Sequence, residues 1–247
     1  MADTTDTPFR EREPMDDDTA LTVLRNGEMH IVGRMPWSSN GTFLVDLEYE
    51  GVQAQGIYKP LRGERPLWDF PSGLYQREAA AYDLSAALDW DLVPPTIVRD
   101  GPLGSGSVQL FVPCDFDEHY FHILEDPRHH HALQRLCVFD VIANSTDRKG
   151  GHCLLDRQGS IWAIDNGLTF HHEFKLRTVI WEWAGDEIPG DIIADLWRLL
   201  DEGVPRAVAA VLHPEECTAM VFRARGLVET GMFPTDPSGR RYPWPLI

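Results

Sequence analysis

The segment "NSTDRKGGHCLLDRQGSIWAIDNG", residues 144–167, constrains the fold of this chain most strongly. It holds two short apolar stretches, "HCLLD" and "SIWAID", separated by "RQG", and this pattern predicts a hairpin. The hairpin would bring Asp147, which precedes it, and Asp165, which ends it, to one site. Asp165 is followed by Asn166 and Gly167, which suits a metal-binding carboxylate because glycine lets the chain turn sharply. The alternative is that both aspartates are ordinary turn residues.

A lysine and a glutamate earlier in the chain fit the same chemistry. Lys59 ends the apolar stretch "GIYKP", and Glu78 lies in the predicted helix "YQREAAAY". Phosphoryl-transfer enzymes pair a strand lysine with a helix glutamate, which aims the lysine at nucleotide phosphates. Each residue alone is most simply a solvated charge. Together with Asp147 and Asp165, in this order, they favour a phosphoryl-transfer site in which one carboxylate takes the acceptor proton and the other holds a metal.

A small polar turn precedes the lysine. Ser38, Ser39, Asn40 and Gly41 stand between two apolar stretches, and their backbone N–H groups could cradle phosphate oxygens. The turn matches neither glycine-rich nucleotide-binding motif, so an ordinary hairpin connection is the alternative.

The order of predicted elements gives an α+β fold. The first half predicts an antiparallel sheet of about four strands, made of a hairpin at residues 20–36 turning at Asn26-Gly27 and a second hairpin at 41–60. A helix at 71–90 and a strand at 106–112 follow. The second half is mainly helical. The boundaries expected from this pattern are a disordered tail at 1–18, a β-rich first lobe with one helix at 19–112 and a mainly helical second lobe at 113–247.

The composition of the chain limits the classes of binding partner and the cellular compartment that we expect for it. The net charge of −17 disfavours nucleic acids and anionic membrane surfaces, because both reward clustered Lys and Arg. No apolar run is long enough to span a bilayer, and the polar N-terminus has no signal-peptide pattern. The four cysteines are scattered, which indicates reduced thiols rather than a zinc site. A cytoplasmic protein is therefore expected.

Several segments resemble the phosphatidylinositol 3/4-kinase-like branch of the kinase superfamily, and most closely the type II phosphatidylinositol 4-kinases. They are "REAAAYDLSAALDWDLVPPTIV", "GSVQLFVPCDFDEHYF", "CVFDVIANSTDRKGGHCLLD" and "IWAIDNGLTFH", and they occur in the family's order between about residues 30 and 185. The resemblance implies a bilobal protein-kinase-like fold that uses ATP with Mg²⁺ or Mn²⁺.

The resemblance also implies roles for individual residues. Lys59 would contact phosphates and Glu78 would anchor it, while Asp147 would be the catalytic carboxylate and Asp165 the metal ligand. The nucleotide would further contact the hinge and nearby residues Leu110, Phe111, Val112 and Leu154.

Two departures from the family stand out. His152 occupies the position of the Asn in the family's D-R-x-x-x-N loop, and an imidazole there would favour Mn²⁺ or a softer metal, or would only orient Asp165 or the loop. The palmitoylated cysteine-rich segment is replaced by "LRGERPLWDFPSGLY", which puts a membrane-lipid substrate in doubt. The acceptor is then a protein or a small soluble hydroxyl compound. Nucleotidyl (AMP) transfer and a nucleotide-binding pseudokinase are the alternatives.

The remaining histidines and tryptophans indicate structural roles. The run "HHH" at 129–131 predicts a solvated helix start, and His171-His172 predicts a solvated loop that could touch substrate. The tryptophans of the second half are expected in the core and in helix packing; they are Trp162, Trp181, Trp183 and Trp197.

Overall fold

The computed structural model describes residues 9, 14–36, 38 and 40–247. Most of the predicted tail and Ser39 therefore lie outside the described residues. The chain forms two compact units: Met1–Ala79 with Pro94–Pro113, and Ala80–Val93 with Cys114–Ile247.

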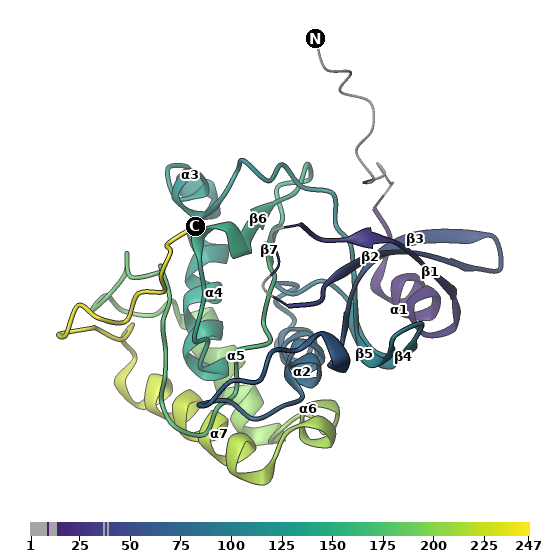
Figure 1. The fold of residues 1–247 in the computed structure, drawn as a ribbon. Coiled ribbons are helices and arrows are strands. Elements are labelled where there is room, and N and C mark those ends of the chain that lie inside the picture. Colours follow the sequence, from purple (N-terminus) through teal and green to yellow (C-terminus); the bar gives the residue numbers. More distant parts are fainter. Residues whose placement is uncertain (1–8, 10–13, 37, 39) are drawn as a thin grey trace. The chain divides into compact units, whose positions relative to one another are not determined.

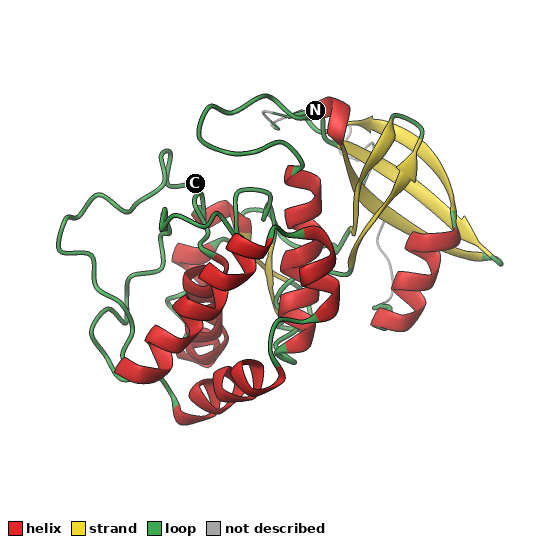
Figure 2. Ribbon diagram, turned by 90° about the horizontal axis from the view of Figure 1, so that it is seen from below, coloured by secondary structure: helices red, strands yellow, loops and turns green. Residues whose placement is uncertain are grey.

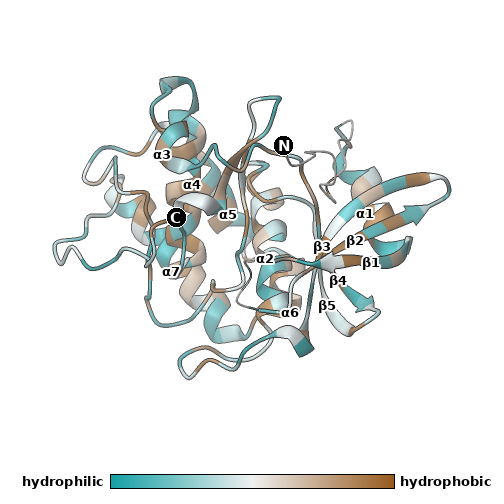
Figure 3. Cartoon of the chain, turned by 45° about the horizontal axis from the view of Figure 1, so that its top comes forward, coloured by the Kyte–Doolittle hydropathy of each residue, from teal (hydrophilic) through white to brown (hydrophobic). Residues whose placement is uncertain are grey.

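The first unit is built on a five-stranded antiparallel sheet in the order β1-β2-β3-β5-β4. Its strands are β1 (Glu28–Arg34), β2 (Phe43–Tyr49), β3 (Val52–Pro60), β4 (Thr96–Gly101) and β5 (Gly104–Leu110). A 3₁₀ turn, η1 (Leu61–Gly63), follows β3, and helix α2 (Leu74–Ala87) begins in this unit. β1 and β2 carry both hydrophobic and hydrophilic segments (Figure 3), as expected where one face of a sheet is covered.

The first stretch predicted as a strand is a helix, α1 (Asp17–Asn26). Asp16 caps it by accepting from the Thr19 N–H, and its buried residues Ala20, Val23 and Leu24 are spaced three and four apart. These side chains belong to one hydrophobic core with residues of the sheet, and Figure 1 shows α1 beside the strands. The prediction of a hairpin was wrong because Asn26 ends a helix here, with the Gly27 N–H bonded to the Val23 carbonyl. The predicted tail boundary at residue 18 falls inside α1.

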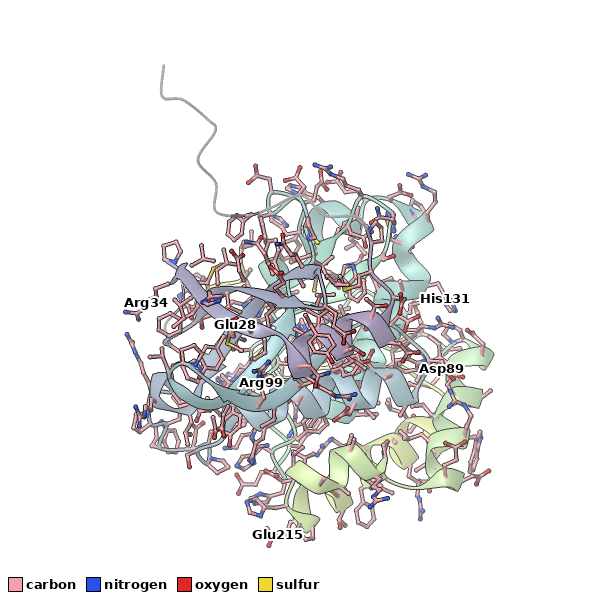
Figure 4. The ribbon with its side chains drawn as sticks, turned by 90° about the vertical axis from the view of Figure 1, so that its right-hand side faces the viewer. Glu28, Arg34, Asp89, Arg99, His131 and Glu215 are labelled. Atoms are coloured by element: carbon pink, nitrogen blue, oxygen red, sulfur yellow. The ribbon has the colours of Figure 1, made fainter. Side chains whose placement is uncertain are left out.

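Arg99 on β4 fastens the end of this helix to the sheet. Its guanidinium Nη1 donates to the carbonyls of Leu24 and Gly27 at 2.7 and 3.0 Å, and Figure 4 labels the side chain. A cation at the C-terminus of α1 also complements the helix dipole.

The second unit is mainly helical (Figure 2), as predicted. Its central helix, α4 (His130–Ala143), is buried over most of its length, and α7 (Pro214–Thr230) packs against α4 and α5 (Gly190–Glu202). The Arg198 guanidinium on α5 donates to the carbonyls of Ala87 and Leu88 at the end of α2. The helices and 3₁₀ turns of this unit are α3 (Tyr120–Ile123), η2 (Pro127–His129), α4, η3 (Gly150–His152), α5 (Gly190–Glu202), α6 (Arg206–Val211) and α7 (Pro214–Thr230).

The predicted hairpin after α4 is present. β6 (Cys153–Leu155) and β7 (Ile161–Ala163) form a two-stranded antiparallel sheet. Asp156 closes its turn by accepting from the N–H groups of Gln158 and Ser160. None of the helices in the described part of the chain has the length and apolar composition needed to cross a bilayer.

Candidate functional site

Lys59 and Glu78 form an ion pair in the first unit, between Nζ and Oε1. β3 holds Lys59 in the sheet, opposite Ser107 of β5, and α2 carries Glu78. The Glu78 side chain is 3% exposed and the Lys59 side chain 21%. A buried carboxylate is costly unless it is paired, so Lys59 stabilises Glu78, and Glu78 in turn fixes the direction of the lysine.

The start of α2 is also held by a carboxylate. Glu64 accepts from the N–H groups of Gly73 and Tyr75, both at 2.9 Å. These bonds satisfy donors at the helix N-terminus, where negative charge is favoured. They anchor the helix that presents Glu78.

The polar turn predicted to cradle phosphate is fastened to the segment after Lys59. The Gly41 N–H donates to the Gly63 carbonyl at 2.8 Å, and the Arg65 N–H donates to the Asn40 side chain at 3.1 Å. A Cβ on Gly41 would lie 2.9 Å from Gly63 Cα, so only glycine permits this approach. The Gly41 N–H is thus hydrogen-bonded within the protein, and the missing side chain at Gly41 allows the close approach to Gly63.

The predicted hinge is hydrogen-bonded to neighbouring segments of the first unit. The Leu110 N–H donates to the Pro95 carbonyl at 2.8 Å, and the Phe111 N–H donates to the Gln55 carbonyl at 2.9 Å. Leu110 and Phe111 are buried, and Val112 is half-buried. In the second unit Leu154, the remaining predicted nucleotide contact, is a buried residue of β6.

Asp147 lies in the loop after α4, in the second unit. Asn144 ends that helix in the left-handed conformation, and the Thr146 N–H donates to the Leu168 carbonyl at 2.9 Å. The Asp147 carboxylate is 31% exposed and lies 3.2 Å from the Lys149 Nζ. Lys149 was not among the predicted site residues, and its cation neutralises the carboxylate that would face an acceptor.

Arg148 is the buried centre of this loop. Its Nε contacts both carboxylate oxygens of Asp140, at 3.0 and 3.2 Å, while Nη1 donates to the Ile164 carbonyl at 2.8 Å and Nη2 to the Asn166 side chain at 2.6 Å. The guanidinium therefore connects α4, the Asp147 loop and the turn that carries Asp165. Burial lowers the pKa of Arg148, but Asp140 and the other acidic groups around the guanidinium together raise it by more, so the net shift of the pKa is upward.

Sequence analysis missed Asp140 and Arg148 as a pair. One signal was present: Asp140 interrupts the apolar run "LCVFDVIA", and a carboxylate in a buried helix needs a partner. The partner's identity could not be read, because any later cation could have supplied it.

Asp165 has a strained backbone with φ of 58°, a left-handed conformation that Asp tolerates better than most residues. The Asp165 side chain is 55% exposed. The next residue, Asn166, is buried, and its amide Nδ2 donates to the Ala163 carbonyl at 3.0 Å. Strain of this kind costs on the order of 1–3 kcal/mol and tends to occur at functional sites.

His152 bridges the two loops. Its Nδ1 lies 3.0 Å from the Asp147 carbonyl oxygen, and its Nε2 lies 3.5 Å from Oδ2 of Asp165. The Ile164 N–H donates to the His152 carbonyl at 3.0 Å. Burial lowers the pKa of the imidazole, and this outweighs the raising effect of the Asp165 carboxylate. Within the described residues no three metal-ligating side chains converge, so Asp165 and His152 are at most part of a metal shell.

The C-terminal segment lies against the Asp147 loop. The Gly150 N–H donates to the Leu246 carbonyl at 2.7 Å, and a Cβ at Gly150 would come 3.1 Å from the Phe121 ring and 3.3 Å from the Leu246 oxygen. At Gly151 the nearest atom would be a methyl carbon of Ile247 at 3.7 Å, which is ordinary contact.

The predictions outside the site have mixed outcomes. The histidine run stands at the start of α4, as predicted, with His131 exposed, although His130 contacts the Leu124 carbonyl at 2.9 Å and His131 lies 3.0 Å from Asp191. His171 is buried rather than solvated. Trp197 is 53% exposed, so it is not a core residue.

Comparison with known proteins identifies one close relative. Protein Rv2133c of Mycobacterium tuberculosis (strain ATCC 25618 / H37Rv) is 39% identical over 267 aligned positions, which span 93% of this chain and 96% of that protein. No family model matches the sequence.

Two solved structures share the fold at low identity. The Helicobacter pylori proinflammatory kinase CtkA is 9% identical with a TM-score of 0.54, covering 84% of this chain and 93% of that one. Hydra Fam20, solved with sugar, is 10% identical with a TM-score of 0.51, covering 86% and 88%. The α+β, kinase-like fold that the sequence predicted is therefore confirmed.

Proposed function

We propose that the chain, which belongs to the same family as Protein Rv2133c, is an ATP-dependent phosphotransferase. We place it with the phosphatidylinositol 3/4-kinase-like enzymes, with a protein or a small soluble hydroxyl compound rather than a membrane lipid as acceptor. The observation that carries the proposal is the Lys59–Glu78 ion pair between β3 and α2 in a kinase-like fold.

Lys59 would bind the phosphates of ATP. Its side chain is partly exposed while that of Glu78 is buried, so the cation can reach a ligand without leaving its partner. The charge of the lysine would offset the charge of the phosphates, and the buried glutamate limits the directions in which the lysine can point.

Asp165 and His152 would hold a divalent cation. An exposed carboxylate at a sharp turn fits Mg²⁺ or Mn²⁺, which commonly take one or two carboxylates and fill the remaining positions with phosphate oxygens and water. When bound, the cation would neutralise charge on the phosphates during transfer.

Asp147 would act on the acceptor. The acceptor hydroxyl oxygen attacks the γ-phosphorus, the bond from that phosphorus to the β,γ-bridging oxygen breaks, and ADP leaves with the electron pair. The hydroxyl proton passes to the Asp147 carboxylate, which Lys149 holds at 3.2 Å.

Two other functions would use the same residues differently. In nucleotidyl transfer the acceptor attacks the α-phosphorus and pyrophosphate leaves. In a pseudokinase, nucleotide binding alone would act as a switch, and the replacement of the loop Asn by His152 is the observation that favours it.

The products of ATP turnover separate these functions. With water as acceptor, the purified chain is incubated with ATP and Mg²⁺ or Mn²⁺, and the nucleotides are resolved by chromatography. ADP supports phosphoryl transfer, AMP with pyrophosphate supports nucleotidyl transfer, and binding without either product supports a pseudokinase.

Variants tie the turnover to the site. Lys59→Met and Asp165→Ala should each abolish turnover, whereas Lys175→Met should not, since Lys175 has a similar exposure of 20% but lies outside the proposed site, 3.8 Å from Glu173. Wild-type turnover in both site variants would refute the assignment.

A further inference from the structure

The His152 ring is held in one orientation by the Asp147 backbone. Its Nδ1 lies 3.0 Å from the Asp147 carbonyl oxygen, and a carbonyl oxygen only accepts hydrogen bonds. Nδ1 therefore carries the proton of this bond. The Lys149 N–H also lies 3.5 Å from Nδ1, and a hydrogen bond there would require Nδ1 to be unprotonated. Because this contact is longer, it is weaker than the bond to the Asp147 carbonyl. In the neutral ring this tautomer leaves a lone pair on Nε2.

That lone pair faces another acceptor. Nε2 lies 3.5 Å from Oδ2 of Asp165. A shared proton would draw the two atoms to about 2.7–2.9 Å, the usual length of a charge-assisted bond. At the longer distance the two atoms do not share a proton, and both can face one cation.

The separation matches two ligands of one metal ion. With both ligand bonds at about 2.1 Å, donor atoms lie roughly 3.0 Å apart at an octahedral angle and roughly 3.4 Å apart at a tetrahedral angle. The observed 3.5 Å is close to the upper value. Bonding of the opposite ring nitrogen to a backbone carbonyl is also the usual support of a metal-ligating histidine.

We infer that His152 Nε2 and the Asp165 carboxylate together bind the divalent cation, and that the site prefers a first-row transition-metal ion to Mg²⁺. The inference rests on the proposed function and specifies its cation. An imidazole nitrogen suits such ions, whereas Mg²⁺ prefers oxygen ligands throughout. Nucleotide phosphates and water would complete the shell, because the described residues offer no third His, Cys, Asp or Glu side chain there.

Pulsed electron paramagnetic resonance of bound Mn²⁺ tests this directly. The full chain is loaded with Mn²⁺ and a non-hydrolysable ATP analogue, once with ordinary histidine and once with ¹⁵N-histidine. Direct ligation predicts a ¹⁴N coupling that becomes a ¹⁵N coupling in the labelled protein. Labelling only histidine separates this signal from nitrogens of the adenine ring.

Variants identify the histidine. His152→Asn should abolish the coupling and weaken Mn²⁺ binding by about tenfold or more, while Mg²⁺ binding changes little. Replacing even a residue that only supports a metal ligand typically weakens metal binding by about tenfold or more. His30→Asn, which alters an exposed residue of β1, should leave the coupling intact.

Two outcomes would overturn the inference, and they differ in what else they refute. Mn²⁺ bound with the nucleotide but without histidine coupling would refute the role of His152 and leave the phosphotransferase proposal standing. No binding of Mn²⁺ or Mg²⁺ with the nucleotide would refute both.

Discussion

Replacing Arg148 with Met removes the cation from a buried network. Asp140, which has no exposed surface, would keep only the hydroxyl groups of Ser145 and Thr178, at 2.7 and 3.0 Å. The Ile164 carbonyl and the Asn166 side chain would each lose a donor.

We expect Arg148→Met to lower the free energy of unfolding substantially. Removing one partner of a buried ion pair typically costs about 3–5 kcal/mol, because the other charge remains buried and unpaired. At about 2–4 °C per kcal/mol for a chain of this size, the melting temperature should fall by roughly 6–20 °C.

A double-mutant cycle separates the lost pair from general damage. Urea unfolding followed by circular dichroism is measured for Arg148→Met, Asp140→Asn and the double variant. The double variant has no unpaired charge, so its loss should be smaller than the sum of the single losses, by about 1–3 kcal/mol. If Arg148→Met unfolds within about 1 kcal/mol of wild type, the network does not hold the loops as argued.

Three further predictions follow from local contacts. Glu78→Gln keeps the hydrogen bond but removes the charge that directs Lys59, so kcat/KM for ATP turnover should fall at least about tenfold with the fold retained. Gly150→Ala should expose the C-terminal segment to limited proteolysis, whereas Gly151→Ala should not. Burial raises the pKa of Cys153 to about 12, so at pH 8 only about one thiolate in 10⁴ forms, and a thiol reagent should label it only after unfolding.

Local patterns made much of the fold predictable. The β6–β7 hairpin was marked by two apolar stretches around a turn, and α2 by its alanine-rich helical spacing. The α1 segment was misread because its apolar residues are few and the Asn-Gly pair that ends it is also the strongest hairpin signal. The capping residue Asp16 and the acidic first turn were the discriminating features.

The site could be predicted only for residues whose type and order in the sequence indicate a chemical role. Lys59, Glu78, Asp147 and Asp165 could be proposed from type and order, and the ion pair between the first two is present. The Arg148 network could not be predicted, because tertiary packing brings its residues together and their spacing in the sequence does not show which of them will meet.

The buried network also bears on whether the His152 substitution marks an inactive protein. A site that only needed to fold would be more easily stabilised by apolar residues, since a buried ion pair is often no better than hydrophobic packing of the same volume. Here Arg148 is instead bonded to Asp140 on α4, and it holds Asn166 beside Asp165, whose backbone is left-handed. Desolvation and strain both oppose stability, so their joint presence around one exposed carboxylate is better explained by a requirement on where that carboxylate points. The metal-dependent transfer proposed above would impose this requirement. On that proposal, His152 changes the metal preference of the site and does not mark a loss of function.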